Sequence, residues 1–212
     1  GALPANPQKT AWQTVIYRAR YSEEKQHALL LSAFRQVVKA IPDAQLHTYG
    51  VGPLRRSLSA RVAEWGLEKA IHINGFTSDI ALVHKTACCT VLCSTQEGQS
   101  LSAVEAMAYG TPLISFAIKY GPRDILQDRE AGILVPCGDE EALAAALIAV
   151  ISDKSLQQSM QQAALRNAQR YYGSAIAGRW AAWLQTSERQ LDAGAERGNG
   201  LEKKRPRAVN VG

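Results

Sequence analysis

The chain has 212 residues, of which 46% are hydrophobic and 20% are charged, as is typical of a soluble globular domain with extensions. Its net charge is only +5, and no basic stripe is interleaved with aromatic residues, which argues against a nucleic-acid-binding protein. No apolar run approaches the roughly 20 residues that span a bilayer. No signal-peptide pattern is visible, so we expect a cytoplasmic protein. Peripheral attraction to the inner face of the membrane or to another anionic surface stays open.

Strands and helices alternate along the chain, because the spacing of apolar residues changes from one segment to the next. In chain order, the pattern predicts a strand over 12–19, a helix over 23–40, a strand over 45–49, a helix over 54–65, a strand over 71–73, a helix over 78–86, a strand over 90–93, a helix over 103–109, strands over 112–116 and 133–135, and helices over 140–151 and 156–171. Such repeated units are typical of parallel sheets. We therefore predict an α/β, Rossmann-like fold with a sheet of about six parallel strands and helices on both faces.

The chain is expected to contain four segments. Residues 1–11 are predicted to be a linker, and residues 12–173 to form the sheet domain. Residues 174–192 carry apolar side chains at helical spacing and are predicted to form a further amphipathic helix. Residues 193–212 are Gly-rich, charged and aperiodic, which predicts a mobile tail.

Turns that could contact a ligand follow the first four strands. These turns are 19–25, 50–53, 74–77 and 95–101. Because the carboxyl ends of parallel strands meet at one edge of the sheet, ligands of such folds bind there. We therefore expect one edge of the sheet to carry a residue from each turn, namely Arg20, Gly52, Phe76 and Gly98.

Two glutamates stand eight positions apart where a buried strand passes into a helix. Glu97 and Gly98 lie in the turn, and Glu105 lies inside the helix. Backbone N–H groups and the helix dipole at such a turn can hold an anionic group such as a diphosphate. Carboxylates beside such a site are better suited to hydroxyl groups than to phosphate, and sugar hydroxyls are the obvious partners.

Two cations follow the first strand. Arg20 can donate a forked pair of hydrogen bonds to phosphate oxygens, and Lys25 adds a point charge. The alternative is that both are surface charges paired with Glu23 or Glu24. The fingerprints of P-loop and dinucleotide-binding proteins and of serine hydrolases are absent from the sequence.

Neither the cysteines nor the histidines have the spacing of metal ligands. The cysteines are Cys88, Cys89, Cys93 and Cys137, and they are expected to be ordinary core thiols. The histidines are spread out, and each is expected to pack or to lie at the surface. The sequence therefore predicts no metal site.

The stretch Glu97-Gly98-Gln99-Ser100-Leu101-Ser102-Ala103-Val104-Glu105, followed by Gly110-Thr111-Pro112, resembles the hallmark of the retaining group 1 glycosyltransferases. The opening Ala19-Arg20-Tyr21-Ser22-Glu23-Glu24-Lys25 resembles the Gly-Arg-x-x-x-x-Lys element of that family, with Ala19 in place of Gly. Members of the family have two facing Rossmann-like domains, the GT-B fold. The resemblance covers roughly residues 12–184 and implies the C-terminal, donor-binding half.

The resemblance also implies roles for individual residues. The residues implied to act in catalysis are Glu97 on the donor sugar and Arg20 and Lys25 on the diphosphate. The residues implied to bind the donor are Gly98, Gln99, Ser100 and Leu101 at the phosphates, Glu105 at the ribose, Gly75, Phe76 and Thr77 near the base, and Gly52. The donor is implied to be a UDP-sugar, which is a substrate, and neither a cofactor nor a metal is implied.

A narrower resemblance lies in the stretch Lys119-Tyr120-Gly121. It is similar to a signature of the poly(glycerol-phosphate) and poly(ribitol-phosphate) glycosyltransferases of teichoic acids, which is shared by enzymes that glycosylate serine-rich adhesins. Ala117 stands where that branch usually has Asp. The resemblance thus implies an acceptor that is a cell-wall teichoic acid or a glycoprotein.

The family resemblance leads to a functional expectation. The chain is expected to be the nucleotide-sugar-binding domain of a hexosyltransferase, and to be inactive without the N-terminal acceptor domain that such enzymes carry. The helix over 174–192 would then cross to that domain. Two alternatives stay open, which are a sugar-nucleotide epimerase of the same architecture and a non-catalytic partner module of a glycosyltransferase.

Overall fold

A computed structural model describes residues 12–126 and 130–183. The predicted linker over 1–11 and tail over 193–212 lie outside the described residues. The chain divides into two compact units, one up to Gln169 and one from Arg170 onward.

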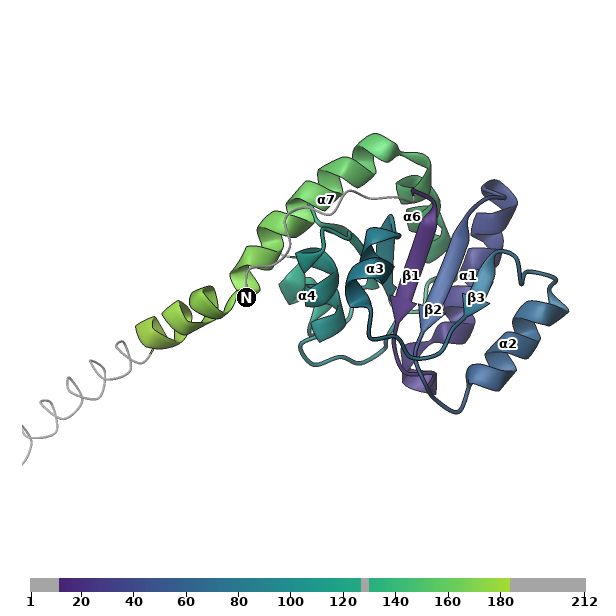
Figure 1. Ribbon diagram of the computed structural model, residues 1–212, viewed down its shortest axis with the longest axis horizontal. Helices are drawn as coiled ribbons and strands as arrows, with labels where there is room; N and C mark the ends of the chain where they lie inside the picture. The colour runs from purple at the N-terminus through teal and green to yellow at the C-terminus, as the bar shows by residue number, and fades with distance from the viewer. Residues whose placement is uncertain (1–11, 127–129, 184–212) are drawn as a thin grey trace, which may run out of the picture. The chain divides into compact units, whose positions relative to one another are not determined.

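A six-stranded, entirely parallel sheet forms the centre of the first unit, with strand order β3-β2-β1-β4-β5-β6 (Figure 1). The strands are β1 Thr14–Arg18, β2 Gln45–Tyr49, β3 Ile71–Ile73, β4 Cys89–Leu92, β5 Leu113–Phe116 and β6 Gly132–Val135. The helices are α1 His27–Ala40, α2 Arg55–Glu64, α3 Ile80–Lys85, α4 Leu101–Ala108, α5 Pro122–Ile125, α6 Glu140–Ser152 and α7 Lys154–Ala168, with short 3-10 turns at Glu23–Lys25 and Gln169–Tyr171. The predicted parallel α/β fold is confirmed.

Helices cover both faces of the sheet (Figure 1). Helix α1 packs against α6 and α2 on one face, whereas α4 and α7 pack together on the other. The strands β4 and β5 are buried along their whole length because they lie between these layers. This explains why they appear in the sequence as continuous apolar runs rather than as alternating ones.

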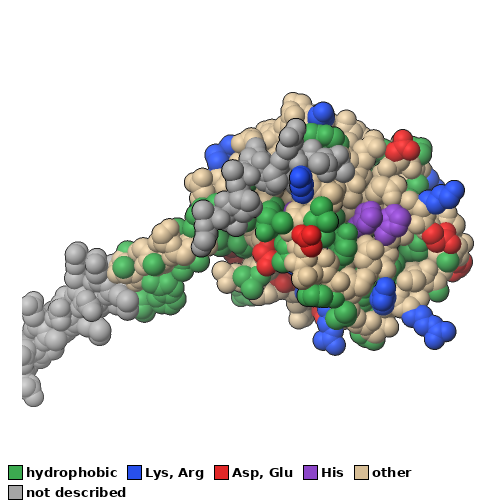
Figure 2. All heavy atoms as spheres, in the orientation of Figure 1, with side chains coloured by type: hydrophobic (Ala, Val, Ile, Leu, Met, Phe, Trp, Pro, Cys, Tyr) green, Lys and Arg blue, Asp and Glu red, His purple; other side chains and the backbone are tan. Residues whose placement is uncertain are grey.

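The second half of β2 shows the opposite pattern. His47 and Tyr49 are half-buried, and between them the side chain of Thr48 is fully buried, so the strand alternates. The rings of His47 and of His72 on β3 stack with centroids 4.3 Å apart. Figure 2 shows histidine side chains gathered on one face, where basic and acidic side chains are interspersed.

The predicted helix over 23–40 is wrong at its beginning. The structure has a 3-10 turn over Glu23–Lys25, then a left-handed residue, Gln26, with φ of 51°, and only then α1. Tertiary hydrogen bonds fix this break, because the Tyr17 hydroxyl donates to the Lys25 carbonyl at 2.8 Å. The Thr95 N–H also donates to the Glu24 carbonyl at 3.0 Å.

Two further differences from the predicted elements concern helices. Helix α4 begins at Leu101 rather than at residue 103, directly after Ser100, which has a left-handed backbone with φ of 48°. Helix α5 over Pro122–Ile125 was not predicted, because four residues are too few to display a helical period.

The second unit contains a helix within the described residues, over 173–183. Trp180 and Trp183 lie in it at an edge-to-face angle with ring centroids 5.8 Å apart, and each is about 60% exposed. The part of the predicted helix from residue 184 onward lies outside the described residues. Among the helices that the structure describes, none is both long and apolar enough to cross a membrane.

Candidate functional site

The sheet changes direction of winding between β1 and β4. The chain moves outward from β1 to β3, and then returns to place β4 on the other side of β1. In open α/β sheets a crevice for ligands lies at the carboxyl ends of the strands at this point. The turn after β1 and the turn after β4 border this crevice, and these are the turns that carry the predicted cations and glutamates.

Lys25 and Glu97 form an ion pair across the crevice. The Lys25 ammonium donates to Glu97 Oε1 at 2.6 Å, and the two side chains are 21% and 12% exposed. A pair this shielded from water holds its members in place better than an exposed pair does. The sequence predicted both residues for one site but did not predict that they pair with each other.

Arg18 and Glu105 form a second ion pair across the same crevice. Arg18 is the last residue of β1, and its Nη1 donates to Glu105 Oε2 on α4 at 2.8 Å. The sequence analysis missed Arg18. Strand alternation was the available signal, because Arg18 points to the same face as Ile16, two residues earlier, which packs beneath α3.

The turn that enters α4 offers unused hydrogen-bond donors. Within the described residues, the amide groups of Gly98, Gln99 and Ser100 donate no hydrogen bond to a protein acceptor. The Ser100 hydroxyl is buried and has no partner there either. Leu101, the first residue of α4, is 67% exposed. These donors, together with the N-terminus of an eight-residue helix, suit an anion.

Gly121 supports this turn from a neighbouring segment. A Cβ atom at Gly121 would come within 2.9 Å of the Gly98 carbonyl oxygen and 2.8 Å of the Ser100 hydroxyl, and its φ of 89° also favours glycine. Gly121 therefore packs directly onto the turn that enters α4. The sequence analysis noted this signature but did not assign Gly121 to the site.

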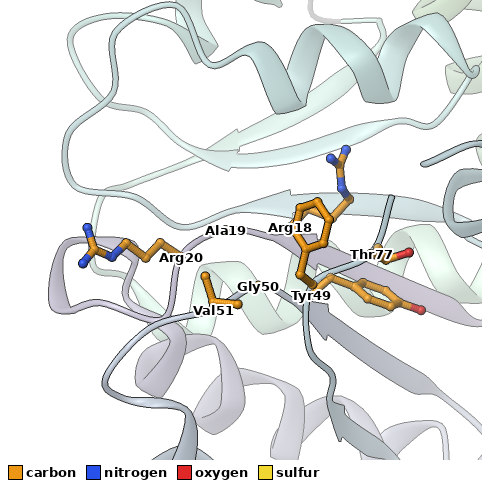
Figure 3. A pocket seen from close by; sticks show the side chains of 8 residues that line it. Arg18, Ala19, Arg20, Tyr49, Gly50, Val51 and Thr77 are labelled. Atoms are coloured by element: carbon orange, nitrogen blue, oxygen red, sulfur yellow. The ribbon is translucent and has the colours of Figure 1, made fainter. Parts of the chain in front are cut away.

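Arg20 lies at the crevice, near the exposed Glu24 carboxylate. Its side chain is exposed, and no hydrogen bond or ion pair joins it to another described residue. Arg20 lines a hollow of about 300 Å³ together with Arg18, Ala19, Tyr49, Gly50, Val51, Phe76 and Thr77. Figure 3 shows the guanidinium groups of Arg18 and Arg20 pointing in different directions. The structure thus brings Phe76 and Thr77 to the hollow, on the β3 side of the crevice.

Close backbone contacts require glycine at two positions in the turn after β2. A Cβ atom at Gly50 would lie 2.0 Å from the Ala19 carbonyl oxygen, and one at Gly52 would lie 2.3 Å from the Tyr21 carbonyl oxygen. Gly50 and Gly52 therefore let the turn after β2 approach the turn after β1. Gly75, the other predicted glycine, has open space around it, and its carbonyl accepts from the Gly50 N–H at 3.2 Å.

An aromatic cluster lies beneath Lys25. The buried His27 ring lies between Tyr17 and Tyr21, with centroids 4.6 Å and 4.8 Å away, and neither ring nitrogen has a hydrogen-bond partner among the described residues. Burial, assisted by the Lys25 charge, lowers the pKa of His27 to about 4. Burial likewise raises the pKa of the Tyr17 phenol well above its usual value. The cluster is uncharged, and its Tyr17 hydroxyl donates to the Lys25 carbonyl, which fixes the turn that carries Lys25.

The cysteines do not combine with other residues into a metal site. Cys88, Cys89 and Cys93 are buried and reduced, as predicted, whereas Cys137 is exposed, so the prediction of a core thiol is wrong at that position. Over residues 12–126 and 130–183, no group of three or more His, Cys, Asp or Glu side chains is placed to hold a metal ion.

Two curated bacterial enzymes are similar to the chain. It is 28% identical over 157 residues to the poly(glycerol-phosphate) alpha-glucosyltransferase of Bacillus subtilis, which covers 74% of this chain and 23% of the relative. It is also 28% identical over 188 residues to the GtfA subunit of the UDP-N-acetylglucosamine--peptide N-acetylglucosaminyltransferase of Streptococcus gordonii, covering 86% of this chain and 37% of the relative. The chain thus spans less than two-fifths of the length of these two relatives.

A solved structure has the same fold. The chain superimposes on S. aureus TarM, crystallised with Fondaparinux, alpha-GlcNAc-glycerol and UDP, with a TM-score of 0.79 and 24% identity. The match covers 85% of this chain and 37% of TarM.

The family comparison covers most of the chain. Residues 4–167 match the family described as glycosyl transferases group 1. This range includes both ion pairs, the turn that enters α4 and all six strands. The chain therefore belongs to the glycosyl transferases of group 1.

Proposed function

We propose that this chain forms the donor-binding domain of a retaining glycosyltransferase that transfers a hexose from a UDP-sugar to a hydroxyl group. One observation carries the proposal. Both glutamates of the eight-residue spacing pair with cations across the β1–β4 crevice, beside three unused backbone amides. Cations and amides suit a diphosphate, and the carboxylates suit sugar hydroxyls.

The proposed donor lies along the crevice. The amides of residues 98–100 and the cations Lys25 and Arg20 meet the negative charge of the diphosphate, which grows as the bond to the sugar breaks. Glu97 accepts from hydroxyl groups of the donor sugar, and Glu105 accepts from the ribose. Phe76 and Thr77 lie near the base. In this proposal protein groups alone stabilise the leaving diphosphate.

The acceptor is proposed from the relatives. One relative is named for a glycerol-phosphate polymer and another for a peptide, and both names describe sugar transfer. We therefore propose a hydroxyl group on a teichoic acid or a glycoprotein as the acceptor. The reported relatives and the family match give no support to an epimerase or to a non-catalytic partner module. A cytoplasmic enzyme, peripheral at the inner face of the membrane, is consistent with such acceptors.

Transfer is proposed to require a second, acceptor-binding domain. Holding two reactants in a reactive geometry can supply roughly 7–11 kcal/mol of the barrier. A donor site alone does not supply this contribution. We therefore expect the 212-residue chain to bind the donor but to transfer no sugar.

Isothermal titration calorimetry tests the proposal. We expect UDP to bind the chain and inorganic pyrophosphate to bind more weakly, because pyrophosphate lacks the ribose and the base. Arg166→Gln is a suitable control, since it breaks an exposed ion pair of 2.9 Å between Arg166 and Glu130. Glu130 precedes β6, at the other edge of the sheet. The absence of UDP binding at millimolar concentration would contradict the proposal. A loss of UDP binding in Arg166→Gln, which leaves the crevice unchanged, would also contradict it.

A further inference from the structure

Arg18 occupies a position between the hollow and the second glutamate. Its backbone lies at the end of β1 beside the hollow lined by Phe76 and Thr77, and its guanidinium reaches Glu105 on α4, 87 residues further along the chain. The Arg18 side chain is 19% exposed and is therefore held firmly. The Glu105 side chain is 43% exposed and would be free to rotate without this contact.

The ion pair leaves part of each group available. Arg18 uses Nη1 on Glu105 Oε2, and among the described residues the Glu105 carboxylate makes no other hydrogen bond. A carboxylate has about four acceptor positions, and a guanidinium has five N–H donors in a fixed plane. Glu105 Oε1 can therefore still accept from a hydroxyl group while Oε2 stays bound to Arg18.

We propose that Arg18 is a positioning residue that determines the selectivity of the site for ribonucleotides. This inference rests on the proposed binding of a nucleoside diphosphate in the crevice. Arg18 fixes the Glu105 carboxylate in one orientation, so that its free oxygen accepts from a ribose hydroxyl of the bound nucleotide. Without Arg18, Glu105 samples several rotamers and must lose that freedom on binding, so the hydroxyl is recognised less strongly.

Lysine does not replace arginine in this role. An ammonium group on a flexible four-carbon stem offers a point charge without the planar fork, so it neutralises Glu105 but does not fix its orientation. Arg18→Lys therefore keeps the positive charge beside Glu105 while it no longer fixes the orientation of the Glu105 carboxylate. Arg18→Gln removes the charge as well, while it keeps a polar group of intermediate length.

Calorimetry with three nucleotides and with inorganic pyrophosphate tests the inference. The nucleotides are UDP, 2′-deoxy-UDP and 3′-deoxy-UDP. We expect the wild-type chain to bind UDP about tenfold more tightly than at least one deoxy analogue, since a hydrogen bond to a charged group is worth that much or more. In Arg18→Gln and Arg18→Lys we expect this preference to fall to about threefold or less. Inorganic pyrophosphate should bind all three proteins equally, which also shows that the variants are folded.

The possible outcomes separate the two proposals. If the wild type binds UDP and Arg18→Gln keeps the full preference for UDP over the deoxy analogues, Arg18 does not position Glu105 and the inference is overturned. A loss of pyrophosphate binding in Arg18→Gln that equals the loss of UDP binding also overturns it, because Arg18 would then act on the phosphates. If the wild type binds neither UDP nor pyrophosphate, the proposed function fails together with the inference.

Discussion

Lys25→Met is expected to weaken UDP binding by about 1.5–3 kcal/mol, which corresponds to a roughly ten- to hundredfold increase in Kd. The reason is the loss of a charge-assisted contact to the diphosphate from a crevice that is partly shielded from water. Lys25→Met also leaves Glu97 unpaired in a site where it is 12% exposed. The double variant Lys25→Met/Glu97→Gln removes this second effect, and we expect it to bind UDP as weakly as the single variant or with only a small recovery. Calorimetry on the three proteins measures these differences.

The companion variant Glu97→Gln is expected to change UDP affinity in the opposite direction or not at all. Glu97 neutralises Lys25 at 2.6 Å and its charge opposes that of a diphosphate, so removing that charge frees the ammonium. In an enzyme that also contains an acceptor domain, however, Glu97→Gln should lower turnover, because Glu97 is proposed to contact the sugar. Normal turnover in that variant would remove Glu97 from the active site. A large loss of UDP affinity would assign it to the nucleotide instead.

His27 is expected to make the fold sensitive to acid. Its pKa is about 4 in the folded protein and about 6.5 in an unfolded chain, so the unfolded state binds the proton more readily. Above pH 6.5, protonation of His27 therefore does not lower the free energy of unfolding. As the pH drops from 6.5 toward 4, protonation of His27 in the unfolded chain lowers it. The difference between pH 7 and pH 4.5 should be about 2–3 kcal/mol from this residue alone.

His27→Leu isolates this effect from the titration of carboxylates. Urea unfolding of the wild type and of His27→Leu at pH 7 and pH 4.5 gives four free energies of unfolding. The wild type should lose more stability than the variant between the two pH values, because leucine cannot be protonated and fits an apolar site between two tyrosine rings. An equal loss in both proteins would show that His27 is not buried in its neutral form.

The sequence predicted the fold and the family because both depend on local patterns. Apolar runs bounded by turns located all six strands within a few residues, and the resemblance of residues 19–25 and 97–112 to group 1 glycosyltransferases indicated the family that the comparisons confirm. The break at Gln26 could not be predicted in this way. It depends on hydrogen bonds from Tyr17 and Thr95, and the second of these lies on a segment about 70 residues further along the chain.

The candidate site was predicted less completely than the fold. Arg20, Gly52, Phe76 and Gly98 follow β1, β2, β3 and β4 at one edge of the parallel sheet as expected, but the roles of the predicted site residues stay predictions. Strand alternation indicates which face of the sheet Arg18 lies on, but nothing in the neighbouring sequence points to Glu105 as its partner. Its partner becomes evident only when α4 lies beside the end of β1. Contacts between distant segments thus carry the information that periodicity and motif spacing lack.

The most direct test of a nucleoside diphosphate in the β1–β4 crevice is a titration of the 15N-labelled chain with UDP, followed by two-dimensional NMR. We expect the largest amide shifts at Gly98, Gln99 and Ser100, whose N–H groups lack a protein acceptor, and smaller shifts at Arg20. Amides at the other edge of the sheet, such as that of Gly132 at the start of β6, should not move. Shifts confined to that other edge, or none at saturating UDP, would contradict the account.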